Sequence, residues 1–207
     1  MNIRRFKGLA RAAVFAVTLT STLTGARATI VYVDPPDITV PATINGGYID
    51  FVTGQVGTSS FAGYDLNPYR QSAATGLAFY TPTGSGVVGT TGSGPTALTV
   101  GVIIGPNSTF LTGAQPAPAF RVDGTEFLGV EFINSTTGVT NYGWVEFTTT
   151  ASTGFPAKLT RFAYEDAGLP IPAGVTGAVP EPSTWATLGL GVIGAGLVAL
   201  RRRVRLA

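Results

Sequence analysis

Residues 125–149 read TEFLGVEFINSTTGVTNYGWVEFTT. Residues 125–133 and 142–149 are rich in β-branched and aromatic side chains, and neither run has an apolar period of 3.6 residues. Between them, NSTTG at residues 134–138 supplies the Asn, Ser and Gly that suit a hairpin loop. The stretch therefore predicts two long antiparallel strands joined by a short loop.

The same β-rich pattern continues outward from this hairpin, and turn-forming clusters interrupt it about every ten residues. The chain has 28 Gly and 14 Pro, which suits short strands and tight turns. We expect an all-β fold, an antiparallel jelly-roll-like β-sandwich over residues 29–172. We also expect mobile loops at residues 83–86 and 91–95, and a flexible linker at 173–178. The other expected strands cover residues 30–33, 47–53, 76–80, 98–104 and 157–164.

Composition excludes several classes of site. The chain has no Cys and no His, which removes disulfides, thiolate nucleophiles, Cys/His zinc sites and His-based catalytic triads. Residues 29–179 carry four basic and ten acidic side chains, a net charge of −6, and the remaining basic residues lie toward the two ends. Without a basic face we expect no nucleic-acid partner. We expect no cofactor, and no metal, because no Asp-rich calcium loop is present.

The N-terminal segment has the three parts of a secretory signal peptide. Arg4, Arg5 and Lys7 form a basic start, and a largely apolar run follows over residues 9–19. Small residues then end in the A-x-A pattern of Ala26 and Ala28, a signal cleavage site. We expect residues 1–28 to form a signal-peptide helix that the secretion machinery recognises, with the mature chain starting at Thr29.

The C-terminal segment 179–207 is typical of a single membrane anchor. Residues 183–200 carry no charge, and at about 1.5 Å per residue a helix there spans roughly 27 Å, enough to cross the hydrocarbon core. The arginines that follow stop transfer and stay cytoplasmic, so the body faces outward. The residues assigned to the anchor are an interfacial Trp185, the helix-surface glycines Gly189, Gly191, Gly194 and Gly196, and the stop-transfer residues Arg201, Arg202, Arg203 and Arg205.

Pro180, Glu181, Pro182 and Ser183 stand just before this apolar run. The two prolines hold their backbone extended and bar a helix, which leaves a segment that a peptidase can reach. A Pro-Glu-Pro motif, an apolar helix and a terminal Arg cluster together resemble the PEP-CTERM sorting domain of Gram-negative bacteria that make extracellular polysaccharide. The resemblance implies that exosortase, a membrane transpeptidase or protease, processes the tail and releases the protein or transfers it to the cell surface.

The body offers few candidates for chemistry. Tyr142 and Trp144 share one strand face, which suits a sugar-stacking platform, although such aromatics also serve as packing. Glu131 and Glu146 meet across the hairpin only if the register brings them together, as a glycoside hydrolase requires. Otherwise they belong to the solvated face of a sheet.

These observations favour a non-enzymatic exported protein on the surface or in the extracellular matrix. Its expected partners are exosortase, the secretion machinery, the membrane through the C-terminal helix, and exopolysaccharide. We expect the ectodomain to face the periplasm while the tail anchors it in the inner membrane, and then to reach the cell surface or the exterior. The alternatives are a carbohydrate-binding module that uses Tyr142 and Trp144, and a glycan hydrolase.

Overall fold

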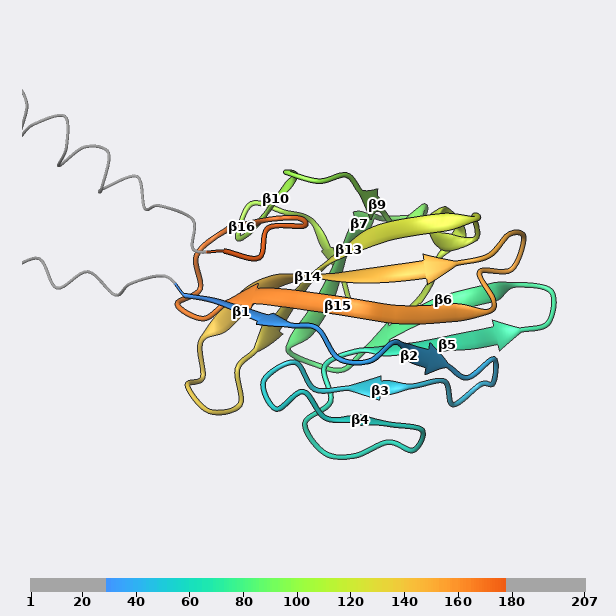
Figure 1. The fold of residues 1–207 in the computed structure, drawn as a ribbon, viewed down its shortest axis with the longest axis horizontal. Helices are drawn as coiled ribbons and strands as arrows, with labels where there is room; N and C mark the ends of the chain where they lie inside the picture. The colour runs from blue at the N-terminus through green and yellow to red at the C-terminus, as the bar shows by residue number, and fades with distance from the viewer. Residues whose placement is uncertain (1–28, 178–207) are drawn as a thin grey trace, which may run out of the picture.

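The expected hairpin lies at the centre of the largest sheet in a computed structural model that describes residues 29–177 (Figure 1). Strand β13 (Gly124–Ile133) pairs with β14 (Thr140–Thr149) over its whole length. The loop is closed by Asn134, whose Oδ1 accepts hydrogen bonds from the N–H groups of Thr136 and Thr137. Gly138 follows with a φ of 73°, which only glycine adopts without strain. The hairpin prediction is confirmed.

All strand pairings among the described residues are antiparallel, and the only helix there is one short 3-10 turn, η1 (Pro118–Phe120). The main sheet has the order β1-β15-β14-β13-β7-β11, to which β2, β8 and β9 attach. Smaller sheets are formed by β12-β6-β5, by β3-β4 and by β10-β16. The remaining bounds are β1 (Ile30–Val33), β2 (Ile38–Val40), β3 (Tyr48–Ile49), β4 (Val56–Gly57), β5 (Asn67–Ser72), β6 (Gly76–Thr81), β7 (Ser85–Thr90), β8 (Gly94–Pro95), β9 (Ala97–Leu98), β10 (Ile103–Ile104), β11 (Phe110–Leu111), β12 (Gly113–Pro116), β15 (Ala157–Glu165) and β16 (Ile171–Pro172).

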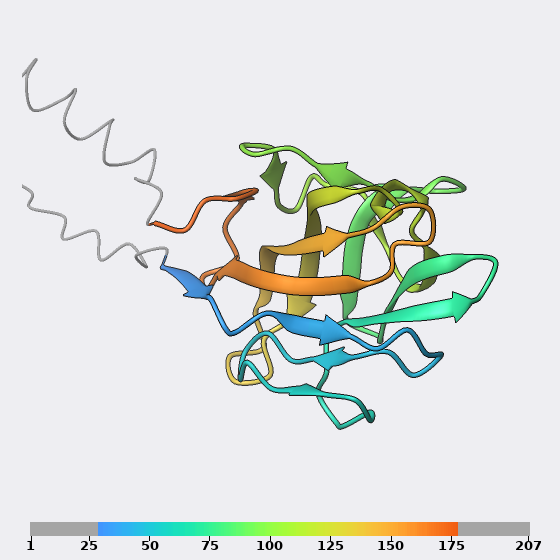
Figure 2. The same ribbon diagram turned by 45° about the vertical axis from the view of Figure 1, so that its right-hand side comes forward.

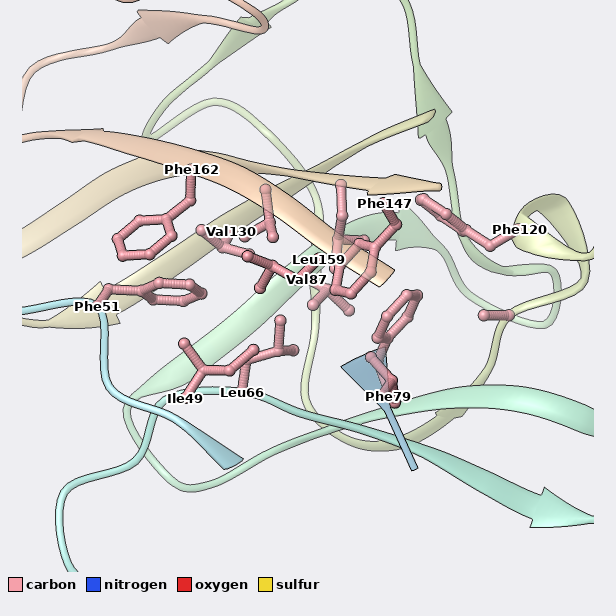
Figure 3. Packing of buried hydrophobic residues seen from close by; sticks show 14 of the residues in the cluster. Ile49, Phe51, Leu66, Phe79, Val87, Phe120, Val130, Phe147, Leu159 and Phe162 are labelled. Atoms are coloured by element: carbon pink, nitrogen blue, oxygen red, sulfur yellow. The ribbon is translucent and has the colours of Figure 1, made fainter. Parts of the chain in front are cut away.

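The larger hydrophobic core fills the space between one face of the main sheet and the layer that contains β3, β5, β6 and η1 (Figure 3). Phenylalanine rings dominate it. Phe79 from β6 lies 5.2 Å from Phe147 of β14 and 5.2 Å from Phe120 of η1, centroid to centroid. Phe51 similarly contacts Phe132 at 5.1 Å. These ring pairs connect the two layers.

The opposite face of the main sheet is covered as well. A second cluster contains Phe127, Tyr142 and Trp144 from the hairpin, and it packs against Ile104 of β10 and Ile171 of β16. Alternation along the strands explains the division, because Leu128 and Val130 point into the first core while Phe127 points into the second. The hairpin is therefore buried on both sides.

The structure confirms an all-β, antiparallel fold and places strands within each of the expected stretches. Two of those stretches are shorter or divided. Residues 98–104 form β9 and β10 separately, because Gly101 turns the chain between them with a φ of 88°. In the stretch 47–53 only β3 is extended, and a turn follows it. The strand β5 has no counterpart among the expected strands.

The expected mobile loops at 83–86 and 91–95 are wrong in part. Strand β7 starts at Ser85 and pairs with β13, and β8 pairs with β7. The glycines there serve close packing: a Cβ on Gly86 would stand 2.9 Å from Glu131 Oε1, and one on Gly89 would stand 2.6 Å from the Gly94 carbonyl oxygen. At Gly86 and Gly89 of β7, glycine therefore reflects crowding between strands, whereas Gly92 in the turn before β8 has open space around it.

Within residues 29–177, no helix has the length and apolar character needed to cross a bilayer. The expected signal-peptide helix (1–28) and the expected transmembrane helix (183–200) lie outside the described residues.

Replacing Phe147 by alanine tests the first core. Phe147 is fully buried and contacts both Phe79 and Phe120, so the truncation removes interlayer packing and leaves a cavity. We expect F147A to lower the free energy of unfolding by about 3–5 kcal/mol, measured by urea denaturation. The control is I44A at a side chain that is 65% exposed, for which we expect a change under about 0.5 kcal/mol. Equal losses in the two variants would contradict this assignment of the core.

Candidate functional site at the end of the folded body

The chain leaves the folded body through β16 and the residues that follow it. Ile171 and Pro172 pair with Ile104 and Ile103 of β10. Beyond the strand, the Ala173 N–H donates to the Val102 carbonyl at 2.8 Å, and the Gly101 N–H donates to the Ala173 carbonyl at 2.9 Å. Ala173 is fully buried. The sheet-like bonding therefore continues past Pro172.

Trp144 fixes the next residues. Its indole Nε1–H donates to the Val175 carbonyl at 3.1 Å, and its ring is fully buried. Phe127 packs edge-on against this ring at 5.3 Å, and the ring of Tyr32 in β1 lies 6.4 Å from it, centroid to centroid. A central strand of the sheet thus holds the last part of the body through one partly buried hydrogen bond.

These contacts correct the linker expected at 173–178. Residues 173–175 belong to the folded body, since Ala173 is buried in the second core and Val175 is bonded to Trp144. The small, Gly-rich composition that suggested a flexible spacer instead allows close packing, as at Gly174, where a Cβ would stand 3.2 Å from the Phe127 ring. The folded body therefore extends at least three residues beyond the expected boundary at residue 172, to Val175.

The body also begins at this end. The Thr29 N–H donates to Asp166 Oδ1 at 3.0 Å, and the Asp166 N–H donates back to the Thr29 carbonyl at 3.1 Å. The turn after β15 is held by Glu165, whose buried carboxylate accepts the N–H groups of Ala167 and Leu169. Figures 1 and 2 show the start of β1 and the end of the described chain at the same end of the molecule.

Tyr142 and Trp144 share a face, as expected, but they do not form an exposed platform. Trp144 is fully buried, and Tyr142 is 8% exposed and stacks on Phe110 at 5.9 Å. Both rings belong to the second core. Their burial favours the packing interpretation and leaves these two rings no exposed face on which a sugar could stack.

Glu131 and Glu146 do not form a catalytic pair. The hairpin register sets Glu131 opposite Tyr142 and Glu146 opposite Phe127. The two glutamates are four residue positions apart, roughly 13 Å along the strands at about 3.3 Å per residue. Glycosidase carboxylates lie about 5–9 Å apart, so this pair does not fit the chemistry.

Glu146 has a structural partner set instead. A β-bulge in β15 puts both Thr160 and Arg161 beside it. Thr160 Oγ1 donates to Glu146 Oε1 at 2.5 Å, and Arg161 donates to Oε2 at 2.7 Å. Both carboxylate oxygens are therefore occupied, and this ion pair holds the bulge.

Sequence reasoning missed a hollow of about 300 Å³ beside Asp65, between residues 61–65, the turn at 82–85 and the end of the hairpin. Asp65 is 7% exposed; its carboxylate accepts the Phe51 N–H at 3.0 Å and the Ser85 hydroxyl at 3.3 Å. Burial raises the pKa of Asp65 to about 7, and the Asp50 carboxylate adds to the rise. No local sequence motif marks Asp65, because the residues that bury and bond it, Phe51 and Ser85, are 14 and 20 positions away in the chain. In the described part of the chain, no three acidic side chains come together as a metal-ligand set.

The buried Asp65 predicts a pH-dependent stability. Unfolded aspartate ionises near pH 4, whereas folded Asp65 keeps its proton to about pH 7. Between these values the folded state binds more protons, so stability falls as pH rises, by roughly 1 kcal/mol per pH unit. We expect D65N to flatten this slope in denaturation series from pH 4 to pH 8. The exposed Asp37, which pairs with Lys158, provides the control D37N. An unchanged slope in D65N would refute the assignment.

The sorting residues predicted at Pro180, Glu181, Pro182 and Ser183 lie outside the described residues, as do Ala26, Ala28 and the anchor residues from Trp185 to Arg205. Residues 178–203 match a protein-family model described as the PEP-CTERM protein-sorting motif. Residues 29–177 thus form an all-β body, and the chain carries a PEP-CTERM sorting motif directly after it. No curated protein and no solved structure matches the chain.

Substituting Trp144 by phenylalanine tests how the end of the body is held. The variant keeps an aromatic ring but loses the bond to the Val175 carbonyl, a loss of about 1 kcal/mol. We expect the amide of Ala173 to exchange with deuterium roughly fivefold faster, while the β13–β14 amides stay protected. The control F110L thins the same cluster without removing a bond to residues 173–175. Equal protection of Ala173 in W144F and wild type would contradict the anchoring role.

Proposed function

We propose that this chain is a non-enzymatic, exported surface or extracellular-matrix protein. The PEP-CTERM motif implies an exosortase-targeted exported protein, and this motif is the single observation that carries the proposal. In the proposal, residues 1–28 direct secretion, residues 183–200 hold the chain in the inner membrane with the body in the periplasm, and exosortase acts at residues 180–183. The mature protein then reaches the cell surface or the exterior and associates with exopolysaccharide.

The position of the two ends supports this topology. Thr29 and the exit segment lie at the same end of the body, so a chain that still has its leader and its tail enters the membrane twice from one side of the domain. The leader and the stop-transfer arginines, taken separately, give the same orientation. We further propose that the facing layers form a jelly-roll-like sandwich, which the interleaved strand order β13-β7-β11 supports.

The proposed non-enzymatic role is supported by the structural hydrogen bonds that buried glutamate side chains make. Glu146 is committed to Thr160 and Arg161, and Glu165 is committed to the turn after β15. A carbohydrate-binding module would need Tyr142 and Trp144 to be exposed, and both are buried. A glycan hydrolase would need Glu131 and Glu146 to face each other, and the hairpin register keeps them apart.

Intact-mass analysis tests the sorting function. We expect the protein isolated from its host to have lost residues 1–28 and to end near the Pro-Glu-Pro motif, and to keep its C-terminus when exosortase is deleted. Replacing Pro180 and Pro182 by alanine removes the rigid extended segment and should block processing. The matched control is P106A, in an exposed loop of the body, which should be processed normally. An identical C-terminus with and without exosortase would sink the proposal.

A further inference from the structure

Exposed apolar side chains gather around the point where the chain leaves the body. Val100 is 70% exposed and Ile103 is 59% exposed, with Val102 at 39% and Leu169 at 41%. All are beside the exit segment, since residues 101–104 bond to residues 171–173, and Leu169 lies two residues before the start of β16. We call Val100, Val102, Ile103 and Leu169 the exit rim.

The chain segments that form the exit rim carry no charged side chains. Residues 71–120 and 167–177 contain no Asp, Glu, Lys or Arg, although the body as a whole is acidic. The charged residue nearest in sequence is Asp166, whose carboxylate accepts the Thr29 N–H. A surface without charges can enter a lipid interface at little desolvation cost, whereas the acidic faces are repelled by anionic headgroups.

The distance from this rim to the sorting motif is short. Val175 is fixed by Trp144, and the motif begins at Pro180, so residues 176–179 are the whole tether. Four extended residues reach about 13 Å. Residues 176–182, seven in all, separate Val175 from a span that starts at Ser183, and they reach at most about 25 Å when extended. The exit end of the body therefore stays within that distance of the bilayer surface, and the rim is the part of the body that can meet it.

We propose that the exit rim is a lipid-contacting surface that seats the body on the outer leaflet of the inner membrane while the tail is still attached. This inference rests on the proposed function, because it requires residues 183–200 to span the bilayer. The rim side chains enter the headgroup boundary, and the body is held with its exit end toward the membrane. The Pro-Glu-Pro segment is thereby kept at a fixed height above the lipid, where a membrane peptidase can reach it.

The chain has no Cys, which allows a single label at any chosen position. The full-length chain is reconstituted into vesicles of phosphatidylethanolamine and phosphatidylglycerol, with V100C or I103C carrying an environment-sensitive fluorophore. The matched control is I44C, because Ile44 is 65% exposed but lies in the β2–β3 loop, at the opposite end of the body (Figures 1 and 2). Nitroxide-labelled lipids then report contact with the membrane surface.

We expect nitroxide lipid to reduce the fluorescence at positions 100 and 103 about twofold or more, since interfacial side chains sit about 5–10 Å into the headgroup boundary. Position 44 should change little. Adding I103D to the V100C chain should remove most of the quenching, because a carboxylate resists that environment.

Other outcomes separate the two proposals. A chain that fails to float with the vesicles overturns the membrane anchor, and the rim proposal with it. A chain that floats but shows no quenching at positions 100 and 103 overturns the rim proposal and leaves the anchor intact. Equal quenching at positions 44 and 103 also overturns it, because the contact would then not be specific to the exit end.

Discussion

The fold depends on covering both faces of the β13–β14 hairpin. Its alternating side chains are apolar on both sides, so each face must be shielded from water. The layer with β5, β6 and η1 shields one side through contacts between phenylalanine rings. The other side is shielded by β10, β16 and the residues after them. The end of the body is therefore a structural part of the domain, and the bond from Trp144 to Val175 closes it.

Sequence patterns were sufficient where strands were long and the loop between them had a clear signature. The runs at 125–133 and 142–149 and the Asn134 loop were predicted almost to the residue. Predictions for the Gly-rich stretches were less successful. Glycine occurs where strands pack closely, as at Gly86 and Gly89, as readily as it occurs in an open loop. The same ambiguity put the linker too early, at residue 173. Local composition carries no information on which backbone will lie against a glycine.

The candidate chemistry was harder to predict because it depends on register and burial. Whether Glu131 and Glu146 meet is decided by which residues pair across the hairpin, and the alternating pattern leaves that pairing undetermined. Whether Trp144 faces solvent depends on a segment 31 positions later in the chain. Asp65 acquires its unusual environment from Phe51 and Ser85, which come from separate strands and turns. The tail motif is contiguous in sequence, so its identification depends on no register or burial.

The mutual bonding of Thr29 and Asp166 gives the proposed leader cleavage an electrostatic consequence. In the precursor, the Thr29 nitrogen is a neutral amide that donates to Asp166 Oδ1. In the proposed maturation, cleavage after Ala28 makes that nitrogen an ammonium group, so the neutral hydrogen bond to Asp166 becomes a charge-assisted one. It also neutralises the aspartate that lies nearest in sequence to the uncharged exit segment. The proposed cleavage would thus complete an electrostatic contact that the unprocessed polypeptide lacks.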